Sequence, residues 1–178
     1  MAAYAAAESG HAVTLLEQNE KLGKKLFITG KGRCNLTNAS DMEQLFANVV
    51  SNRKFLYSAF YSYDNEQVIS FFESHGMPTK TERGNRVFPV SDHSSDVIAA
   101  LSTALRGQHV EVLLHTKVNR LLLEKRDEEK RVTGVELADH TKMHADAVIV
   151  ATGGISYPST GATGDGYRMA EELSLIHI

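Results

Sequence analysis

The chain has 178 residues, of which 42% are hydrophobic and 23% charged, values that are ordinary for a globular domain with one sizeable core. Its net charge of −3, without a concentrated basic block, argues against a nucleic-acid partner and against an anionic membrane surface. No apolar run approaches the roughly 18 residues that span a bilayer, so no membrane partner is expected.

Cysteine and histidine usage excludes further classes of protein. The single Cys34 cannot form an internal disulfide and offers no cysteine cluster for zinc, so a cytoplasmic protein is expected. The eight histidines are scattered without a His-x-x-x-His pair, so no metal site is expected.

The first predicted elements are a helix over 2–9, which stops at Gly10, and a strand over 11–17. In a dinucleotide-binding unit, an acidic residue at the end of the second strand commonly binds a ribose hydroxyl, and Glu17 stands at that place. The alternative is a solvated strand end. The strand and the Gly-x-Gly-x-x-Gly turn that should precede the helix are not in the sequence, so we expect a chain truncated on its N-terminal side.

We expect truncation at the other end as well. Residues 173–178 break off without a helix cap, and they match the translated end of a transposon adaptor used in sequencing libraries. These six residues are therefore interpreted as a non-native tail.

A stretch rich in glycine and cations covers residues 22–38. Gly23, Gly30 and Gly32 alternate with lysine and arginine, and short polar residues follow. A backbone that can bend freely beside cations fits a pyrophosphate and a polar ring system, with Arg33 able to make a bidentate contact. The alternative is a solvated basic loop.

Residues 41–77 are predicted to be helical, because apolar side chains between Phe55 and Phe72 recur at about helical spacing. Tyr63-Asp64-Asn65 is the expected break, with Asn65 as the cap of the next helix. The aromatic residues are interpreted as core or helix–helix packing, and the alternative is an aromatic box over a ring-shaped ligand.

Gly76-Met77-Pro78 ends the helical region, and two strands over 79–82 and 86–89 are predicted to form a hairpin around Gly84-Asn85. A helix over 96–106 follows, capped by residues 91–95. His93 within this cap is interpreted as a surface residue, and the alternative is a general acid.

The second half is predicted to open with a strand over 109–114. Segments 116–124, 131–138 and 142–145 then form a β-meander, broken at Asp127-Glu128-Glu129 and at Asp139-His140. The mixed charges of 124–131 are interpreted as a solvated turn.

The most informative stretch lies over 146–166. Residues 147–151 are apolar and rich in β-branched side chains, and Gly153-Gly154 closes them, which predicts a buried strand of a parallel sheet. Ligands of α/β sheets bind where such strands end, and glycine lets the backbone approach a bulky cofactor. Further glycines around Asp165 precede a helix over 167–173, whose first N–H groups suit a phosphate or another electron-rich group. The alternative is a strand-ending turn without a ligand.

Two long motifs resemble those of one bacterial flavoprotein family. The first is Gly30-Lys-Gly-Arg-Cys-Asn-Leu-Thr-Asn38, preceded by Glu17 and Gly23-Lys-Lys25. The second is Ala151-Thr-Gly-Gly-Ile-Ser-Tyr-Pro-Ser-Thr-Gly-Ala-Thr-Gly-Asp-Gly-Tyr167. The chain is similar, over nearly its whole length to about Leu173, to the NAD(P)/FAD-dependent oxidoreductases also described as aminoacetone oxidase-like FAD-binding enzymes and BaiN-like flavoproteins. Lys31 departs from the glycine often found there.

The resemblance implies an α/β fold, a Rossmann-like FAD-binding domain of parallel sheet and helices with a β-meander at about 116–145. Residues 1–173 would be a partial FAD/NAD(P)-binding domain without its first strand and later insertion domain. FAD is the implied cofactor, and NAD(P)H the candidate electron donor. Glu17 would bind the adenosine ribose and the Val118 backbone the adenine, while Arg86 and Ser91 could line the site. The remaining implied cofactor-binding residues are Lys25, Gly32, Arg33, Cys34, Asn35 and Thr37 along the pyrophosphate and flavin, Ala151, Thr152 and Gly153 on the second contact strand, and Gly164, Asp165 and Gly166 near the isoalloxazine or ribityl chain.

We therefore predict an FAD-dependent oxidoreductase that uses the hydride transfer of the flavin on a small-molecule substrate, and we assign no catalytic side chain. Cys34 alone cannot form the dithiol of a disulfide reductase, so it is interpreted as a small residue packed near the cofactor. The alternative is a non-catalytic dinucleotide-binding or scaffold fragment. A flavin-dependent RNA-modifying enzyme is disfavoured by the net charge.

Overall fold

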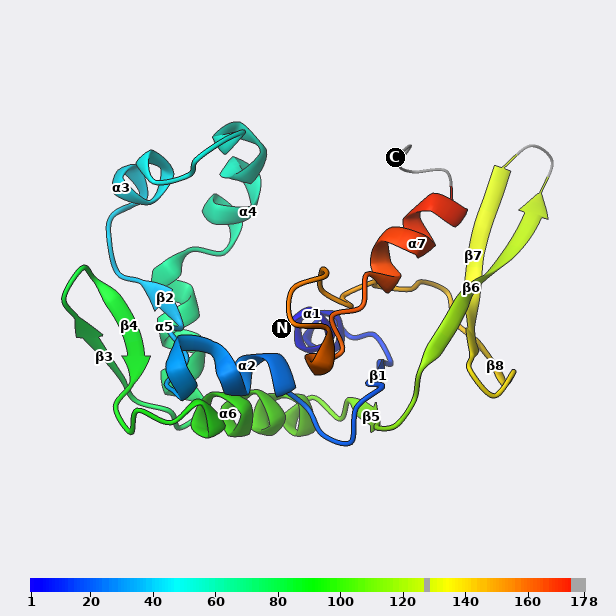
Figure 1. Cartoon of the computed structure of the whole chain (residues 1–178), viewed down its shortest axis with the longest axis horizontal. Coiled ribbons are helices and arrows are strands. Elements are labelled where there is room, and N and C mark those ends of the chain that lie inside the picture. Colours follow the sequence, from blue (N-terminus) through cyan, green and yellow to red (C-terminus); the bar gives the residue numbers. More distant parts are fainter. Residues whose placement is uncertain (127–128, 174–178) are drawn as a thin grey trace. The chain divides into compact units, whose positions relative to one another are not determined.

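The structure is a computed structural model of the chain that describes residues 1–126 and 129–173 (Figure 1). The chain forms two compact units. The first unit contains Met1–Lys25 and Gln108–Ile178, and the second contains Leu26–Gly107. The second unit is therefore inserted in the sequence of the first.

The first unit opens with the predicted helix and strand. α1 (Ala2–Glu8) ends just before Gly10, whose φ of 89° is left-handed and suits glycine. β1 (Thr14–Leu16) pairs in parallel with β5 (Glu111–Leu113), and Leu15 lies opposite Val112. Parallel neighbours need a long crossover connection, and here the whole second unit supplies it.

The predicted β-meander is confirmed. β6 (Val118–Arg126), β7 (Glu129–Leu137) and β8 (Lys142–His144) form an antiparallel sheet in chain order. Leu121 and Val135 of this sheet pack with Met169 of α7 (Asp165–Glu172), and all three side chains are buried. The core of the first unit thus fixes α7 against the meander. Of the predicted break at 127–129, residues 127–128 lie outside the described residues and Glu129 already belongs to β7. The interpretation of 124–131 as a turn is wrong for 124–126 and 129–131, which pair as strands.

The prediction of a buried strand over 147–151 is wrong. None of the described strands pairs with this run, and Ile149 and Val150 are 63% and 43% exposed. The run is anchored at its flanks, where Ala145 N donates to Thr133 O and Gly164 N donates to Gly154 O. β-branched composition favours a strand, but a strand also needs a neighbour to receive its backbone hydrogen bonds.

The second unit contains a small antiparallel sheet. β3 (Thr79–Glu82) and β4 (Arg86–Pro89) form the predicted hairpin, with left-handed Gly84 and Asn85 at its turn. β2 (Thr37–Asn38), for which no strand was predicted, pairs with the other edge of β4. The predicted helix after the hairpin is confirmed as α6 (Ser94–Gly107).

In the chain, short helices precede β2 and lie between β2 and β3. α2 (Lys24–Ile28) and the 3-10 helix η1 (Thr29–Gly32) precede β2. Between β2 and β3 the chain forms α3 (Met42–Ala47), η2 (Arg53–Leu56), α4 (Tyr57–Ser62) and α5 (Asn65–Ser74). The predicted break between α4 and α5 is confirmed.

Among the described residues, no helix combines the length and the apolar character that crossing a bilayer requires.

The cap of α5 is Asp64 and not Asn65. The Asp64 carboxylate accepts a hydrogen bond from Gln67 N, and the Gln67 side chain accepts one from Asp64 N, which completes a capping box. Asn65 Nδ2 instead donates to the carbonyls of Asn38 and Ser40, at 2.8 and 2.9 Å. Asn65 therefore ties α5 to the end of β2.

The aromatic residues of the helical region divide into two groups. Phe71 and Phe72 of α5 are buried, as the packing interpretation expects. Phe46 of α3 is buried too, and its ring lies 4.5 Å from that of Tyr57. Phe55 is 79% exposed, so the packing interpretation is wrong for that residue.

Candidate functional site

The predicted cofactor-binding residues fall into two sets, one on each unit. The first unit carries Glu17, Lys25, Val118, Ala151, Thr152, Gly153, Gly164, Asp165 and Gly166, and the second carries Gly32, Arg33, Cys34, Asn35 and Thr37.

The acidic end of β1 is joined to the loop that contains η3 (Pro158–Thr160). Glu17 Oε1 accepts hydrogen bonds from Asn19 N and Nδ2, at 2.8 and 2.7 Å. Gln18 Nε2 donates to Gly161 O at 2.8 Å, and Asn19 Nδ2 lies 3.2 Å from Thr160 O. Gly161 has a φ of 95°, and a Cβ there would lie 2.8 Å from Asn19 Nδ2, so this loop requires glycine.

Sequence reasoning missed Gln18 and Asn19. The position of Asn19 two residues after Glu17 was the available signal, because a short amide can bond groups close to it in the chain. The contacts with Thr160 and Gly161 join residues more than 140 positions apart, and no local pattern indicates them. In the structure they orient the Glu17 carboxylate and hold the glycine loop beside it.

Lys25 is attached to the same loop. Its Nζ donates to Ser156 O at 2.8 Å and lies 4.7 Å from the ring centroid of Tyr157. Tyr157 has a φ of 55°, which is unfavourable for a residue with a Cβ, so the lysine supports a strained turn.

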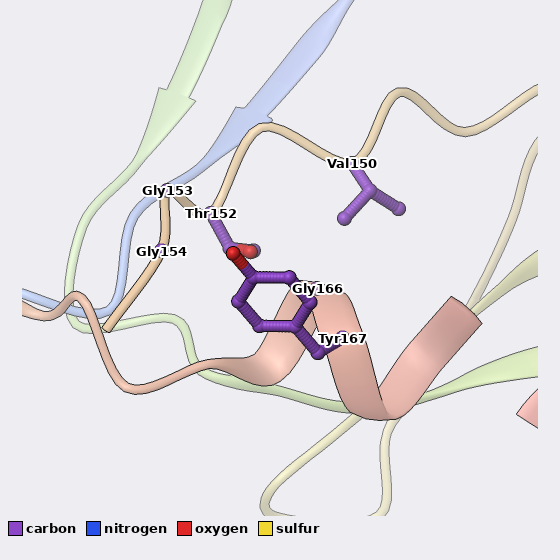
Figure 2. A pocket seen from close by; sticks show the side chains of 6 residues that line it. All are labelled: Val150, Thr152, Gly153, Gly154, Gly166 and Tyr167. Carbon is purple, nitrogen blue, oxygen red and sulfur yellow. The ribbon is translucent and has the colours of Figure 1, made fainter. Parts of the chain in front are cut away.

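A hollow of about 380 Å³ lies where the 147–151 run meets α7 (Figure 2). Figure 2 shows the Thr152 side chain directed toward the Tyr167 ring, with Gly166 beside both. A Cβ on Gly166 would lie 2.8 Å from Thr152 Oγ1, so glycine keeps this space open. Six residues line the hollow: Val150, Thr152, Gly153, Gly154, Gly166 and Tyr167.

Three of these lining residues were predicted, namely Thr152, Gly153 and Gly166. Val118 is instead partly buried against the Leu121–Val135–Met169 core. Ala151 is exposed next to Thr152.

The first turn of α7 carries a negative charge. Asp165 Oδ2 accepts a hydrogen bond from Thr163 Oγ1 at 2.6 Å, and this bond, with Arg168 on the other oxygen at 3.3 Å, lowers the pKa of the Asp165 carboxyl. A carboxylate suits a helix N-terminus, but it repels an anion placed there. The helix start therefore favours a hydroxyl or an amide N–H over a phosphate.

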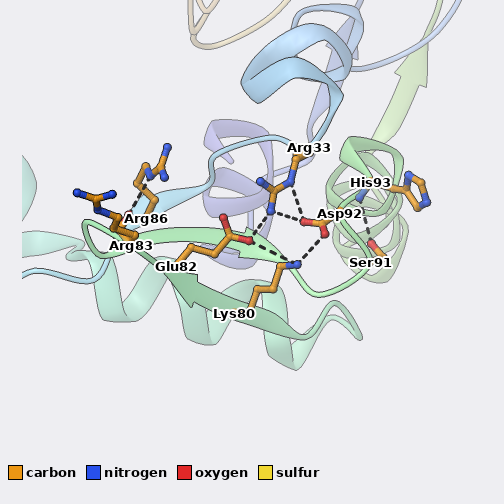
Figure 3. Close-up of polar contacts among 8 residues, drawn as sticks. All are labelled: Arg33, Lys80, Glu82, Arg83, Arg86, Ser91, Asp92 and His93. Atoms are coloured by element: carbon orange, nitrogen blue, oxygen red, sulfur yellow. Dashed lines mark hydrogen bonds and ion pairs between the residues drawn. The ribbon is translucent and has the colours of Figure 1, made fainter.

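In the second unit, Arg33 takes part in a network of ion pairs (Figure 3). Its Nε donates to Asp92 Oδ1 at 2.8 Å, and its Nη2 donates to Glu82 Oε1 at 2.5 Å. Lys80 Nζ donates to the other oxygen of Asp92 at 2.7 Å. The guanidinium also lies 4.2 Å from the centroid of the Phe88 ring.

The network sets the ionisation of its members. The hydrogen bonds that Arg33 donates to Glu82 and, second, to Asp92 raise the pKa of Arg33. Arg33 lowers the pKa of the Glu82 carboxyl, and Lys80 followed by Arg33 lowers that of Asp92. Arg33, Glu82 and Asp92 are therefore charged near neutral pH. The Nε and Nη2 atoms that Arg33 would offer to a phosphate are already engaged.

The backbone beside Arg33 has an unusual conformation. Gly30, Lys31, Gly32 and Cys34 all have φ between 54° and 86°. Lys31 and Cys34 carry side chains, and Cys34 is only 3% exposed. A Cβ on Gly30 would lie 2.8 Å from Asn35 N.

The next residues continue into the sheet. The Asn35 amide, in the orientation that satisfies both partners, donates to Val87 O and Thr37 O. Thr37 lies opposite Val87 in the β2–β4 pair. The five predicted residues of the second unit thus belong to one loop and the strand that follows it.

The neighbouring residues singled out in the sequence make local contacts (Figure 3). Arg86 Nε donates to Arg83 O at 3.1 Å, and Ser91 Oγ accepts from His93 N at 3.3 Å. The His93 side chain is exposed.

A parallel strand pair bridged by a long insertion, followed by a meander, places the chain in the Rossmann-like class. It is similar to the crystal structure of Thermovibrio ammonificans THI4, with a TM-score of 0.61 and 13% identity over 99% of this chain and 58% of that chain. It is also similar to the open conformation of a flavocytochrome c3 fumarate reductase, with a TM-score of 0.63 and 24% identity over 97% of this chain and 38% of that chain. At these identities the likeness shows the fold alone, and it confirms the predicted fold class.

The family described as HI0933-like protein Rossmann domain matches residues 1–177, and the chain belongs to it. The family resemblance predicted from the two motifs is thereby confirmed.

Curated relatives carry two different names. The chain is 35% identical over 175 residues to the 3-dehydro-bile acid delta(4,6)-reductase of Clostridium scindens, covering 97% of this chain and 41% of the relative. It is 29% identical over 170 residues to the ribosomal RNA dihydrouridine synthase of Haemophilus influenzae, covering 95% and 41%, and 28% identical over 171 residues to that of Escherichia coli, covering 96% and 40%. The chain spans about 40% of the length of these relatives.

Proposed function

We propose that this chain is the FAD-binding part of a flavin-dependent oxidoreductase. The observation that carries the proposal is the glycine-lined hollow of the first unit. The acidic end of β1 in the same unit, already oriented by Asn19, supports it. Membership of the HI0933-like Rossmann family and the 35% identity to a reductase support it further.

The residues present fit part of a dinucleotide cofactor. A volume of about 380 Å³ lies at the lower end of the range for ligand sites, so the hollow suits one ring system and not a whole dinucleotide. Its floor lacks side chains at Gly153, Gly154 and Gly166, which allows close approach of a flat group. The Thr152 hydroxyl can donate to or accept from a polar atom on that group.

Two carboxylates would recognise hydroxyl groups. Glu17 accepts from Asn19 through one oxygen, and its other oxygen would bind a ribose hydroxyl. Asp165 would accept from a hydroxyl of the ribityl chain, because its charge disfavours a phosphate at the same place. Bound FAD would supply hydride transfer, while the chain supplies binding and orientation.

NAD(P)H is the electron donor that we propose, and a small molecule is the proposed substrate. The reductase name of the relative at 35% identity supports a small organic substrate.

A ribosomal RNA substrate is a second candidate, favoured by one surface of the second unit. Arg53 and Lys54 are exposed and directly precede Phe55 in the chain, and Phe55 and Tyr61 are 79% and 69% exposed. Cations next to exposed aromatic rings can bind single-stranded RNA through backbone charge and base stacking. The relatives from Haemophilus influenzae and Escherichia coli support this candidate, and the net charge of −3 weighs against it.

The alternative to both is a dinucleotide-binding fragment without turnover. FAD titration of the purified chain, followed by gel filtration and then by anaerobic addition of NADH or NADPH, separates the cases. A flavin spectrum that is retained and then bleached supports an oxidoreductase, and a retained but unreactive flavin supports the fragment. A chain that retains no flavin contradicts FAD binding.

Two glutamates give a matched pair for the titration. We expect Glu17→Ala to raise the dissociation constant for FAD at least tenfold, because a hydrogen bond to a charged group contributes about 1.5–3 kcal/mol. Glu20→Ala removes an exposed carboxylate that pairs only locally with Lys24, and it should leave FAD binding unchanged. Equal effects of the two changes would exclude Glu17 as a ribose ligand.

The RNA candidate has its own measurement. Fluorescence anisotropy with a labelled single-stranded RNA should show binding that is lost in the Arg53→Ala/Lys54→Ala double variant. If the wild-type protein does not bind the RNA, the RNA candidate is contradicted and the small molecule is retained as the proposed substrate.

A further inference from the structure

We infer that Arg33 is a positioning residue, which locks the left-handed loop over 30–34 against the β3–β4 hairpin through Glu82 and Asp92. Its contribution to cofactor binding is then to hold this loop in shape, and not to contact a phosphate. The part of the inference that concerns the cofactor rests on the proposed function, whereas the lock itself does not.

The loop needs an external restraint. Four of its five residues have positive φ, and two of these, Lys31 and Cys34, carry a Cβ that disfavours this conformation. Within the loop, Cys34 N donates to Thr29 O at 3.1 Å and Arg33 N donates to Gly30 O at 3.2 Å. Such strained conformations persist where the surrounding structure over-determines them.

The Arg33 side chain supplies that restraint from the hairpin. Glu82 is the last residue of β3, and Asp92 lies in the turn between β4 and α6. One guanidinium therefore joins the loop to two segments of the hairpin region at once. A planar fork with fixed donors is suited to two carboxylates in this way, and lysine is not.

Phe88 provides the surface against which the loop is held. Its ring lies 4.2 Å from the guanidinium carbon of Arg33, and its Cε1 lies 3.6 Å from the place of a Cβ on Gly30. Phe88 is only 4% exposed, so its own position is fixed by the core. Gly30 at the start of the left-handed segment and Arg33 near its end thus lie against the same ring.

Charge balance argues against a direct phosphate contact. Arg33 and Lys80 are neutralised by Glu82 and Asp92 within one network. A phosphate that approached Arg33 would meet two carboxylates within hydrogen-bond distance of the same guanidinium.

The two roles predict opposite results for the Glu82→Gln/Asp92→Asn double variant. If Arg33 were a phosphate ligand, removal of its two carboxylate partners would strengthen FAD binding. If Arg33 is a lock, the same change loosens the loop, and we expect the dissociation constant for FAD to rise at least tenfold.

The only cysteine of the chain reports on the loop without any cofactor. Cys34 is next to Arg33 and is buried, so 4,4′-dithiodipyridine can react with its thiol only when the loop opens. We expect the double variant and Arg33→Gln each to speed this labelling at least tenfold. Arg33→Lys should lie between Arg33→Gln and wild type, because lysine keeps the charge and loses the fork.

Arg83→Gln is the matched control, since it removes another arginine of the same hairpin and should leave labelling and FAD binding unchanged. Urea unfolding of each variant shows whether faster labelling exceeds what global unfolding explains. Unchanged Cys34 labelling, or tighter FAD binding by the double variant, overturns the lock. If no variant and no wild-type protein binds FAD, the proposed function fails, and the labelling rates alone decide the lock.

Discussion

Ion pairs between side chains hold the Arg33 loop (residues 29–35). In the Gly153 loop (residues 152–166), Gln18, Asn19 and Lys25 instead donate hydrogen bonds to backbone carbonyls. In the Arg33 loop, two carboxylates and an aromatic ring fix the guanidinium, and Gly30 is pressed against the backbone of Asn35. In the Gly153 loop, Gln18 bonds one carbonyl, and a Cβ on Gly153 would meet nothing within 4 Å.

The Arg33 loop is therefore preformed, whereas the Gly153 loop leaves space open for a ligand. The Arg33 loop has its left-handed conformation already stabilised, so a ligand would not have to order it. The Gly153 loop keeps an exposed hollow that a ligand could fill. Substitutions in the Arg33 loop should therefore affect stability first, and substitutions in the Gly153 loop should affect binding first.

The largest expected effect is that of Gly30→Ala. Its φ of 54° disfavours a Cβ, and the new Cβ would lie 2.8 Å from a backbone nitrogen that cannot move away easily. We expect the free energy of unfolding to fall by about 3 kcal/mol or more. Gly32→Ala shares the positive φ but has open space around the Cβ, and it should cost about 1–2 kcal/mol. Urea unfolding measures both, and equal costs would mean that the loop is not packed as described.

Gly166→Ala, unlike Gly30→Ala, should affect FAD binding more than stability. The new Cβ would be too close only to Thr152 Oγ1, the end of a side chain that can rotate, whereas Val150 Cγ1 at 3.5 Å and Gly153 O at 3.9 Å would be ordinary contacts. Alanine also favours a helix by about 1 kcal/mol over glycine. We expect the free energy of unfolding to change by less than about 1 kcal/mol, while the dissociation constant for FAD rises at least tenfold because the hollow is partly filled.

Gly107→Ala at the end of α6 is the helix-glycine control for Gly166→Ala. A Cβ there would meet nothing within 4 Å, so FAD binding should not change. Loss of FAD binding in both variants would show that the hollow is not the binding place.

The sequence predicted the elements whose causes are local. Gly84-Asn85 specified the hairpin turn, Gly10 ended α1, and polar breaks between apolar segments predicted the meander. The strand over 147–151 was predicted wrongly, because its formation depends on a neighbouring strand that composition cannot supply. Pairings such as Arg33 with Asp92, 59 residues apart, could not be read from the chain, because no local pattern records which distant side chain will lie opposite.

Acid should loosen the Arg33 loop before it affects the meander. The pKa values of Glu82 and Asp92 are lowered in the folded protein, so their ion pairs stabilise it above the ordinary carboxyl range and are lost as the pH falls through the folded pKa values. We expect Cys34 labelling, relative to an unfolded control at each pH, to accelerate severalfold below about pH 4. The Glu82→Gln/Asp92→Asn variant should lack this acceleration.

Glu136 gives the counterpart in the first unit. Its hydrogen bond with Arg120 lowers the pKa of this nearly buried carboxyl from 4.5 to about 2. The contribution of Glu136 is therefore complete above pH 4.5 and is lost only as the pH falls toward 2. Glu136→Gln should lower the stability of the first unit at pH 6 and flatten its decline between pH 4.5 and 2. If the Arg33 network and the Arg120–Glu136 pair were lost at the same pH, the predicted difference in acid sensitivity between the two units would be wrong.

The smallest expected effect is that of Lys25→Met, which removes the contacts of the Lys25 ammonium group with the Gly153 loop. Lys25 Nζ bonds Ser156 O and lies over the Tyr157 ring, and an exposed contact of this kind contributes about 0.5–1 kcal/mol. We expect a loss of stability in that range. Lys24→Met breaks only the exposed ion pair of Lys24 with Glu20, a residue that precedes α2, and it should cost about 0.2–1 kcal/mol.

The salt dependence of the dissociation constant for FAD distinguishes two possible roles of Lys25. A lysine that contacts a phosphate contributes an attraction that added salt screens, so the effect of Lys25→Met would shrink as the salt concentration rises. A lysine that acts through the carbonyl of Ser156 contributes by shaping the loop, so the effect would be the same at low and high salt. We expect the second result, with the dissociation constant for FAD raised about threefold at both 0.05 and 0.5 M salt, because Ser156 and Tyr157 already engage the ammonium group. A tenfold effect confined to low salt would instead assign Lys25 to the cofactor and would make the Gly153 loop, like the Arg33 loop, one that is held by charge.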